Sequence, residues 1–313
     1  MQTWSGMAVV FGEVLVEDGT GAAKVGGAPF NLARHLAAFM APPLLITRIG
    51  DDRNGAAVRA EFERFVMPET GLQVDAMEET GRVAVARGTA SQRPVMLPGQ
   101  AYDFIDPEAA AAAVAGMNTD IVYFGTLAQR GARSRQALAA VLAAAPQAKR
   151  FLDLILYQGQ ADEALVTGAL QAADIVKVNE EELQVLFQWY FQIAPDDAPM
   201  STEEVHAVCR ALMDRFSLEG LIVTLGHRGS VYFGRDGGLV VNRDNPVPPF
   251  VIDTVGAGDA FAAIFLLGRA RGWSLELTLA RANEFAGAIC AVTGAVPQDM
   301  NFYDKWERRW REA

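Results

Sequence analysis

The sequence reads Phe250-Val251-Ile252-Asp253-Thr254-Val255-Gly256-Ala257-Gly258-Asp259-Ala260-Phe261 in its last quarter, and this stretch says most about the fold. Phe250 to Ile252 is strand-like, and the apolar run from Ala260 to Leu267 predicts a buried helix. Glycines between them let the backbone turn sharply because no Cβ is in the way. Backbone N–H groups at such a helix start lack partners and lie at the positive end of the dipole, which favours binding of an anion such as phosphate.

Short apolar runs alternate with helical patterns along the rest of the chain. Helices are predicted at residues 29–39, 55–65 and 277–291, and a polar loop is expected at 189–202. Strands are expected at residues 8–11, 44–47, 121–124, 151–154, 175–178 and 221–225. Strands that alternate with helices indicate parallel βαβ units. The sequence therefore predicts an α/β fold, with a mostly parallel central sheet covered by helices on both faces, in a single domain over residues 1–313.

Two segments break this alternation. Residues 82–86 and 94–97 predict an antiparallel hairpin, and residues 13–25 are strand-like but too polar for the core. We interpret the segments at about 13–26 and 81–98 as a small β lid over the active edge of the sheet. The alternative is a pair of plain surface hairpins.

The net charge and the cysteine content indicate which partners and metals the protein is not expected to bind. The formal net charge of −11 offers no broad basic face for nucleic acid and does not favour an anionic membrane. The two cysteines, Cys209 and Cys290, have no Cys or His at metal-ligand spacing, so a zinc site is disfavoured and a reducing compartment is expected. The sequence shows no basic leader and no apolar run that could cross a bilayer. We therefore expect a cytoplasmic protein.

Asp259 has two interpretations. A carboxylate in the first turn of a helix is favourable wherever it occurs, so Asp259 could simply cap the helix. Alternatively, the turn amides hold a phosphate while Asp259 accepts a proton from an incoming hydroxyl, which is nearly all that phosphoryl transfer requires. The sequence contains no GxxxxGK[ST], and Gly12-Glu13-Val14-Leu15 follows the first strand where a dinucleotide fold would have GxGxxG. A P-loop enzyme and a Rossmann oxidoreductase are thus disfavoured.

The stretch Asp253 to Phe261 resembles the C-terminal signature of the ribokinase-like (PfkB) carbohydrate kinases. Four further motifs resemble those of the family, in the same order and spacing: Gly26–Asn31, Arg48–Gly55, Lys177–Glu182 and Thr224–Gly229. The resemblance covers nearly the whole chain.

This resemblance implies roles on the ATP side of the site. Asp259 would be the catalytic base, and the anion hole would be formed by the amides of Gly256, Ala257 and Gly258. Mg²⁺ and the ATP phosphates would be organised through water by Asn179 and Glu182, although Asn179 could instead be a helix N-cap. The nucleotide would be lined by Thr224, Gly226, Gly229 and Asn283, although Asn283 could equally be an exposed helix residue. A monovalent cation such as K⁺ would be held by Asp253 and the Val255 carbonyl, although Asp253 could simply cap the turn.

The resemblance also implies roles on the acceptor side. Gly26 and Gly27 would let the backbone approach a sugar, and Asn31 would hydrogen-bond its hydroxyls or make a local backbone bond instead. Glu17 stands where the family usually has Asp, and Asp18 is next; either could bind sugar hydroxyls, and Asp18 is the one we choose. The family's Asp-x-Asn-x-Arg is replaced by Asp153-Leu154-Ile155-Leu156-Tyr157, which weakens the case for an acidic sugar. The segment from Glu17 to Gly26 is short, which implies a reduced lid.

The sequence therefore predicts ATP-dependent phosphorylation of a sugar hydroxyl. Gly12-Glu13 and Ala101-Tyr102-Asp103-Phe104 look most like the fructokinase branch. Alternatives are a kinase of a nucleoside, sugar acid or other small alcohol, and a catalytically silent sugar- or nucleotide-binding protein of the same fold. In related kinases the lid often forms part of a dimer interface, so the resemblance also suggests a homodimer.

Overall fold

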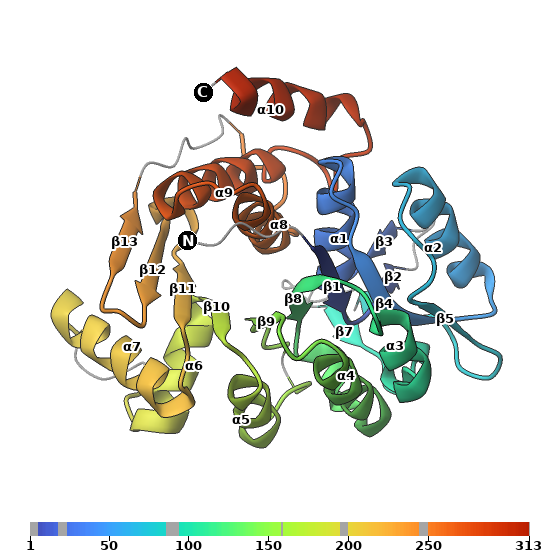
Figure 1. Ribbon diagram of the computed structural model, residues 1–313, viewed down its shortest axis with the longest axis horizontal. Coiled ribbons are helices and arrows are strands. Elements are labelled where there is room, and N and C mark those ends of the chain that lie inside the picture. Colours follow the sequence, from blue (N-terminus) through green and yellow to red (C-terminus); the bar gives the residue numbers. More distant parts are fainter. Residues whose placement is uncertain are drawn as a thin grey trace.

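The computed structural model describes residues 6–17, 24–85, 94–157, 159–194, 200–243 and 250–312. Within these ranges, nine strands form one twisted central sheet (Figure 1). Across the sheet the order is β13 (Leu239–Asn242), β12 (Ser230–Gly234), β11 (Gly220–Thr224), β10 (Ile175–Asn179), β9 (Lys149–Asp153), β8 (Thr119–Phe124), β1 (Met7–Phe11), β4 (Leu44–Gly50) and β5 (Leu72–Asp75). All neighbours pair in parallel except β11–β12 and β12–β13, which are antiparallel.

The central strands are apolar along their length because helices cover both of their faces. In β11, for example, Leu221, Ile222 and Val223 are successive residues and all are buried. The expected strands at 8–11, 44–47, 121–124, 151–154, 175–178 and 221–225 all fall within β1, β4, β8, β9, β10 and β11 or within one residue of them.

Helices lie on both faces of the sheet (Figure 1). One layer contains α1 (Ala28–Ala38), α2 (Arg53–Arg64), α8 (Ala257–Ala270), α9 (Leu275–Ile289) and α10 (Asn301–Glu312). The other contains α3 (Pro107–Val114), α4 (Ala132–Ala144), α5 (Glu163–Gln171), α6 (Glu180–Phe191) and α7 (Thr202–Phe216). Each layer packs its own apolar cluster against the sheet. The predicted fold class is confirmed.

A second, small sheet stands apart from the central one. In the described residues it has the order β3 (Lys24–Gly26), β2 (Leu15–Glu17), β6 (Arg82–Val85) and β7 (Pro94–Met96). The β6–β7 pair is the predicted antiparallel hairpin, and β2 joins it through parallel pairing with β6. Residues 18–23 and 86–93 lie outside the described ranges. We refer to this sheet as the lid; its covering role stays a prediction.

Two local expectations are wrong. Phe250 to Ile252 is not a strand: these residues have no regular structure, and Phe250 is 76% exposed. Among the described residues no strand pairs with this segment, and the Ile252 N–H donates to the Cys290 carbonyl at 2.8 Å. The expected loop from residue 189 begins later, since α6 continues to Phe191 and buries Tyr190. The β12–β13 hairpin was not predicted.

Within the part of the chain that the structure describes, no helix is both long enough and apolar enough to span a membrane.

Candidate active site

The predicted site residues gather where the carboxyl ends of the central strands meet the start of α8. The strand order reverses at β1, which pairs with β4 on one side and with β8 on the other. In an open α/β sheet, ligands bind at the carboxyl edge beside such a reversal. Asp153 ends β9 and Asn179 ends β10, so the topology brings both to this edge.

The turn before α8 depends on Gly256. Its backbone is left-handed, with φ 82° and ψ −4°, and a Cβ there would lie 2.5 Å from the Cα of Ala295. Only glycine meets both conditions. Two turn amides are used locally: Val255 N donates to Asp253 Oδ1 at 3.0 Å, and Ala257 N donates to the Thr254 carbonyl at 3.3 Å. The interpretation of Asp253 as a cap of this turn is confirmed; its role toward a cation stays a prediction.

Asp259 lies in the first turn of α8 and contacts α1. Its Oδ2 accepts a 2.7 Å hydrogen bond from Asn31 Nδ2, 228 residues away in the sequence. Burial raises the pKa of Asp259 to about 6, while the Asn31 bond and the charge of Lys177 pull it down. A carboxyl with such a pKa is ionised at neutral pH and still suited to accept a proton.

A buried charge pair lies beside the turn, and the sequence analysis assigned it no role. Lys177 Nζ lies 2.7 Å from Asp153 Oδ1, and the Tyr123 hydroxyl donates to Asp153 Oδ2 at 3.0 Å. The Lys177 side chain is 6% exposed. A Cβ built on Gly258 would lie 3.5 Å from Lys177 Nζ, so the ammonium group is next to the predicted anion hole. The available signal was a lone lysine in the apolar strand Ile175–Val178.

Asn179 and Glu182 form a capping box at the start of α6. Glu182 N donates to Asn179 Oδ1 at 2.8 Å, and Asn179 N donates to Glu182 Oε2 at 2.7 Å. The N-cap interpretation of Asn179 is therefore confirmed. Burial raises the pKa of the Glu182 carboxyl to about 7.

These two residues also fit a magnesium ion. The described residues contain no cluster of three or more His, Cys, Asp or Glu that could hold a metal by itself. Mg²⁺ does not need one, because it keeps several waters and takes one or two carboxylates plus substrate phosphates. A nearby cation would favour the ionised form of Glu182, which burial disfavours.

The predicted nucleotide loop follows β11. Gly229 is required by the fold, since its φ is 98° and a Cβ would come within 1.9 Å of the Asn242 carbonyl oxygen. A Cβ on Gly226 would meet no atom within 4 Å, so Gly226 faces open space. Thr224 ends β11 and its hydroxyl donates to the Val178 carbonyl at 3.3 Å.

Asn283 is not the exposed helix residue that one interpretation required. It is 6% exposed, and its Nδ2 donates to Ser230 Oγ at 2.9 Å, which joins α9 to the start of β12. A contact between Asn283 and the nucleotide stays a prediction.

On the acceptor side, Gly27 precedes α1 with φ 104°, and a Cβ there would lie 2.8 Å from the Glu13 carbonyl oxygen. Gly26 ends β3, and Asn31 is 4% exposed in the first turn of α1. Asp18 lies outside the described residues. Glu17 pairs with Lys24 across the lid strands at 4.0 Å, with its side chain 42% exposed.

Glu13 and Tyr102 lie in the two motifs that look like the fructokinase branch, and neither was predicted as a site residue. In the described part of the chain, Glu13 Oε2 and the Tyr102 hydroxyl are buried without a hydrogen-bond partner. Burial raises the pKa of Glu13 to about 8, and the charge of Asp259 adds to the rise. A buried polar atom without a partner is costly, so a hydroxyl-bearing ligand would improve this region. The signals in the sequence were these two motifs and the single glutamate among apolar residues at Glu13.

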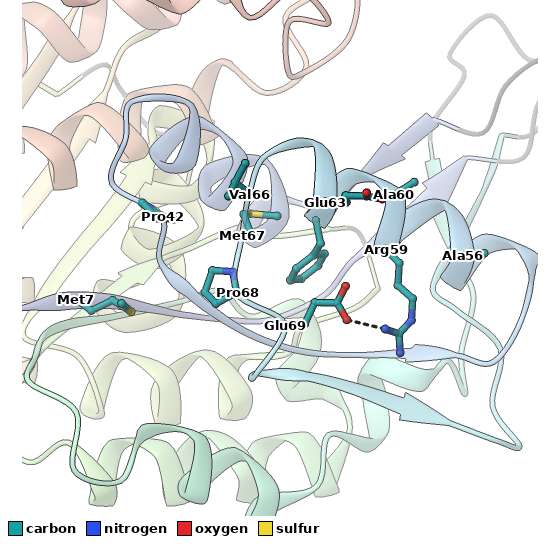
Figure 2. Close-up of a pocket in the computed structure, with 11 residues that line it drawn as sticks. Met7, Pro42, Ala56, Arg59, Ala60, Glu63, Val66, Met67, Pro68 and Glu69 are labelled. Carbon is teal, nitrogen blue, oxygen red and sulfur yellow. Dashed lines mark hydrogen bonds and ion pairs between the residues drawn. The ribbon is translucent and has the colours of Figure 1, made fainter.

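A separate hollow lies at the opposite edge of the sheet (Figure 2). It is lined by Met7, Pro42, Val66 and Met67, and by Arg59 and Glu69, which form an ion pair of 2.6 Å. Met7 begins β1, so this hollow is at the amino ends of the strands and away from Asp259. It is not part of the candidate site.

Residues 3–300 match the family model described as pfkB family carbohydrate kinase. Ribokinase of Arabidopsis thaliana is 26% identical over 283 residues, which cover 89% of this chain and 70% of the relative. Fructokinase-1 of Oryza sativa subsp. japonica is 27% identical over 329 residues, and the match covers 94% of each protein.

Solved structures share the fold. A double mutant of fructokinase from Vibrio cholerae O395, solved with fructose, ADP and potassium ion bound, has a TM-score of 0.74 at 22% identity, and the match covers 97% of this chain and 99% of that one. Aminoimidazole riboside kinase from Salmonella enterica has a TM-score of 0.74 at 20% identity, and the match covers 95% of this chain and 99% of that one. The family match and these relatives confirm the predicted resemblance and indicate a sugar kinase that transfers phosphate to an alcohol group. This chain belongs to the PfkB family of carbohydrate kinases.

Proposed function

We propose that this kinase transfers the γ-phosphoryl group of ATP to a hydroxyl of a neutral, fructose-like sugar, with Asp259 as the base. The observation that carries the proposal is the position of Asp259, one residue beyond the Gly256–Gly258 turn and bonded to Asn31. Helix capping alone does not require an amide from another helix to hold this carboxylate.

Asp259 accepts the proton of the acceptor hydroxyl. Asn31 donates to Oδ2, so Oδ1 is the oxygen that takes this proton. The hydroxyl oxygen then bonds to the γ-phosphorus, the bond to the bridging oxygen breaks, and ADP leaves. The sugar phosphate forms without an enzyme-bound intermediate.

Negative charge on the moving phosphoryl group is stabilised from two directions. The backbone N–H groups of Gly256 and Gly258 lie at the positive end of α8, whereas the Ala257 N–H already donates to the Thr254 carbonyl. Lys177 supplies a full positive charge next to Gly258, and Asp153 holds it in place. Such preorganised charge is the main protein contribution to phosphoryl transfer.

Cations complete the charge balance. Mg²⁺ bound with ATP neutralises phosphate oxygens, and Asn179 and Glu182 would hold it largely through water. A monovalent cation such as K⁺ would take oxygen ligands from Asp253 and the Val255 carbonyl, both in the turn. We assign the nucleotide contacts to the residues predicted for them, Thr224, Gly226, Gly229 and Asn283. Each assignment is tested by replacing the residue and measuring how the rate of ADP release depends on ATP concentration.

The acceptor is assigned from what lines its side of the site. Tyr157 and Ile155 stand where the family often has Arg and Asn, so no guanidinium is present at those positions to pair with a sugar carboxylate. Gly26, Gly27, Asn31 and Asp18 would contact the sugar. Two plant fructokinases match over more than nine-tenths of this chain, which supports a neutral ketose.

The test is ADP release with Mg-ATP and a panel of neutral sugars, sugar acids and nucleosides. We expect fructose or a similar sugar to stimulate release, and Asp259→Asn to lower it by about 10²–10⁴-fold. Asp236→Asn is the control, because Asp236 is exposed beyond β12. Stimulation only by a nucleoside or a sugar acid would reassign the acceptor. Binding of a sugar without turnover would favour the silent binding protein.

We further propose a homodimer formed through the lid. In the described residues β3 and β7 are the edge strands of the lid, and exposed edges favour pairing with another chain. Val95 on β7 is 50% exposed. Light scattering coupled to size exclusion decides between monomer and dimer. A cytoplasmic location stays a prediction.

A further inference from the structure

Arg34 is a buried arginine that belongs to none of the motifs above. It lies one turn after Asn31 on α1 and is 2% exposed. Nη1 donates to Glu61 Oε2 on α2 at 2.7 Å, and Nη2 donates to the Val25 carbonyl on β3 at 2.8 Å. Its guanidinium carbon also lies 4.6 Å from the ring centroid of Phe30. A charged group this buried is held in one place.

The third contact of Arg34 reaches the base. Nη2 donates to Asn31 Oδ1 at 2.7 Å, and Asn31 Nδ2 donates to Asp259 Oδ2 at 2.7 Å. Arginine has no acceptor atom, so it forces the oxygen of the Asn31 amide to face it. The amide nitrogen must then face Asp259. If the amide turned over, two oxygens would confront each other at the base.

We propose that Arg34 is a positioning residue, which fixes the Asn31 amide toward Asp259 and ties this pair to lid strand β3. The inference rests on the proposed function and adds how its base is oriented. Since one guanidinium bonds both the Val25 carbonyl and Asn31, a displacement of β3 changes the contact that aims the amide at Asp259. Lid position and base orientation are therefore linked through Arg34.

Other groups facing Asp259 stay unchanged when Arg34 is replaced. Asp153 on β9 and Lys177 on β10 act on its charge in opposite directions, and Glu13 lies near it after β1. Tyr123 and Tyr157 also face it. Loss of Arg34 removes a positive charge and frees the Asn31 amide, and both changes raise the pKa of Asp259.

The first test measures the Asp259 pKa by carboxyl NMR without ATP or sugar, with Asp259→Asn for assignment. Arg34→Met should raise the pKa by about one unit, and Arg34→Lys by less. Arg64→Met is the matched control, because Arg64 also contacts Glu61, at 3.3 Å, and does not bond Asn31. An unchanged pKa in Arg34→Met overturns the proposal. If Arg34→Met does not fold, the smaller rise expected in Arg34→Lys carries the same comparison.

The second test is a double-mutant cycle on sugar-dependent ADP release. Arg34→Met should lower kcat about tenfold at pH 6.5 in the wild-type background and much less in Asn31→Ala, because there only the lost positive charge still acts on Asp259 and the contact through Asn31 is already gone. Equal losses in both backgrounds overturn the proposal. Absence of sugar-dependent ADP release in the wild type would refute the proposed function instead, and the NMR titration would still decide the role of Arg34.

Discussion

The phosphate side and the acceptor side of the site differ in how their polar groups are satisfied. On the phosphate side, both oxygens of Asp153 accept hydrogen bonds, and Glu182 accepts from two backbone N–H groups. On the acceptor side of the described residues, Glu13 Oε2 and the Tyr102 hydroxyl are buried without partners. The fold thus completes the phosphate side by itself, while the acceptor side lacks bonds that a ligand can supply. This difference indicates that the groups for phosphoryl transfer are in place before the acceptor binds. Specificity then depends on how well the acceptor supplies the missing hydrogen bonds.

The largest losses of stability and activity are expected when Lys177, on the phosphate side, is replaced. Lys177→Met leaves Asp153 buried and unpaired, which should cost about 3–5 kcal/mol of unfolding free energy. It should also lower kcat by about 10²–10³-fold through loss of charge beside Gly258. Urea unfolding and steady-state kinetics measure the two effects.

Lys149→Met is the matched control for that experiment. Lys149 pairs with Glu219 at the same 2.7 Å distance, but both side chains are more than 40% exposed. Its loss should cost about 0–1 kcal/mol and leave kcat unchanged. Equal costs for the two lysines would contradict the distinction between a buried and an exposed pair.

On the acceptor side, the prediction concerns the buried carboxyl of Glu13 and the pH dependence of stability. Its pKa is about 8 when folded and 4.5 as a free side chain, so the folded state holds a proton that the unfolded state releases. This contribution to stability is fully present below pH 4.5 and is lost as pH rises through 8. Between pH 5 and 8.5 the Tm of Glu13→Gln should fall at least about 3 °C less than that of the wild type.

Glu17→Gln is the control for that titration, because Glu17 is on the lid and its side chain is 42% exposed. It should follow the wild-type Tm curve. If Glu13→Gln also follows that curve, the carboxyl of Glu13 is not protonated in the folded protein.

The smallest effect on stability is expected at Asn179, where capping and cation binding can be separated. Asn179→Ala removes the N-cap and should cost about 1 kcal/mol, while Asn179→Asp keeps a capping oxygen. If Asn179 also orders the metal, Asn179→Ala should raise KM for Mg-ATP by about tenfold. A loss of stability with an unchanged KM would leave Asn179 as a cap alone.

The features predicted correctly from the sequence are those that depend on residues close together in the chain. The alternation of strands and helices gave the sheet and both helix layers, and the glycines at 256 and 258 gave the turn before α8. The strand at 250–252 was wrong because an apolar run says nothing about whether a partner strand exists. The β12–β13 hairpin was missed although it pairs through eight residues around a short turn.

Contacts between distant residues could not be predicted. The bonds from Asn31 to Asp259 and from Asn283 to Ser230 join residues that only the completed fold brings together. Lys177, Glu13 and Arg34 are single polar residues within apolar surroundings, and the sequence does not say which partner each one meets. Asp18 was predicted as a sugar ligand and lies outside the described residues.

The most direct measurement of the central claim is kcat/KM for sugar-dependent ADP release as a function of pH. Burial raises the pKa of Asp259 to about 6, and only the ionised carboxylate can accept the proton. The account predicts a rate that falls tenfold per pH unit below about 6 in the wild type, with that limb absent from the residual activity of Asp259→Asn. Wild-type activity retained by Asp259→Asn at pH 7.5 would contradict it.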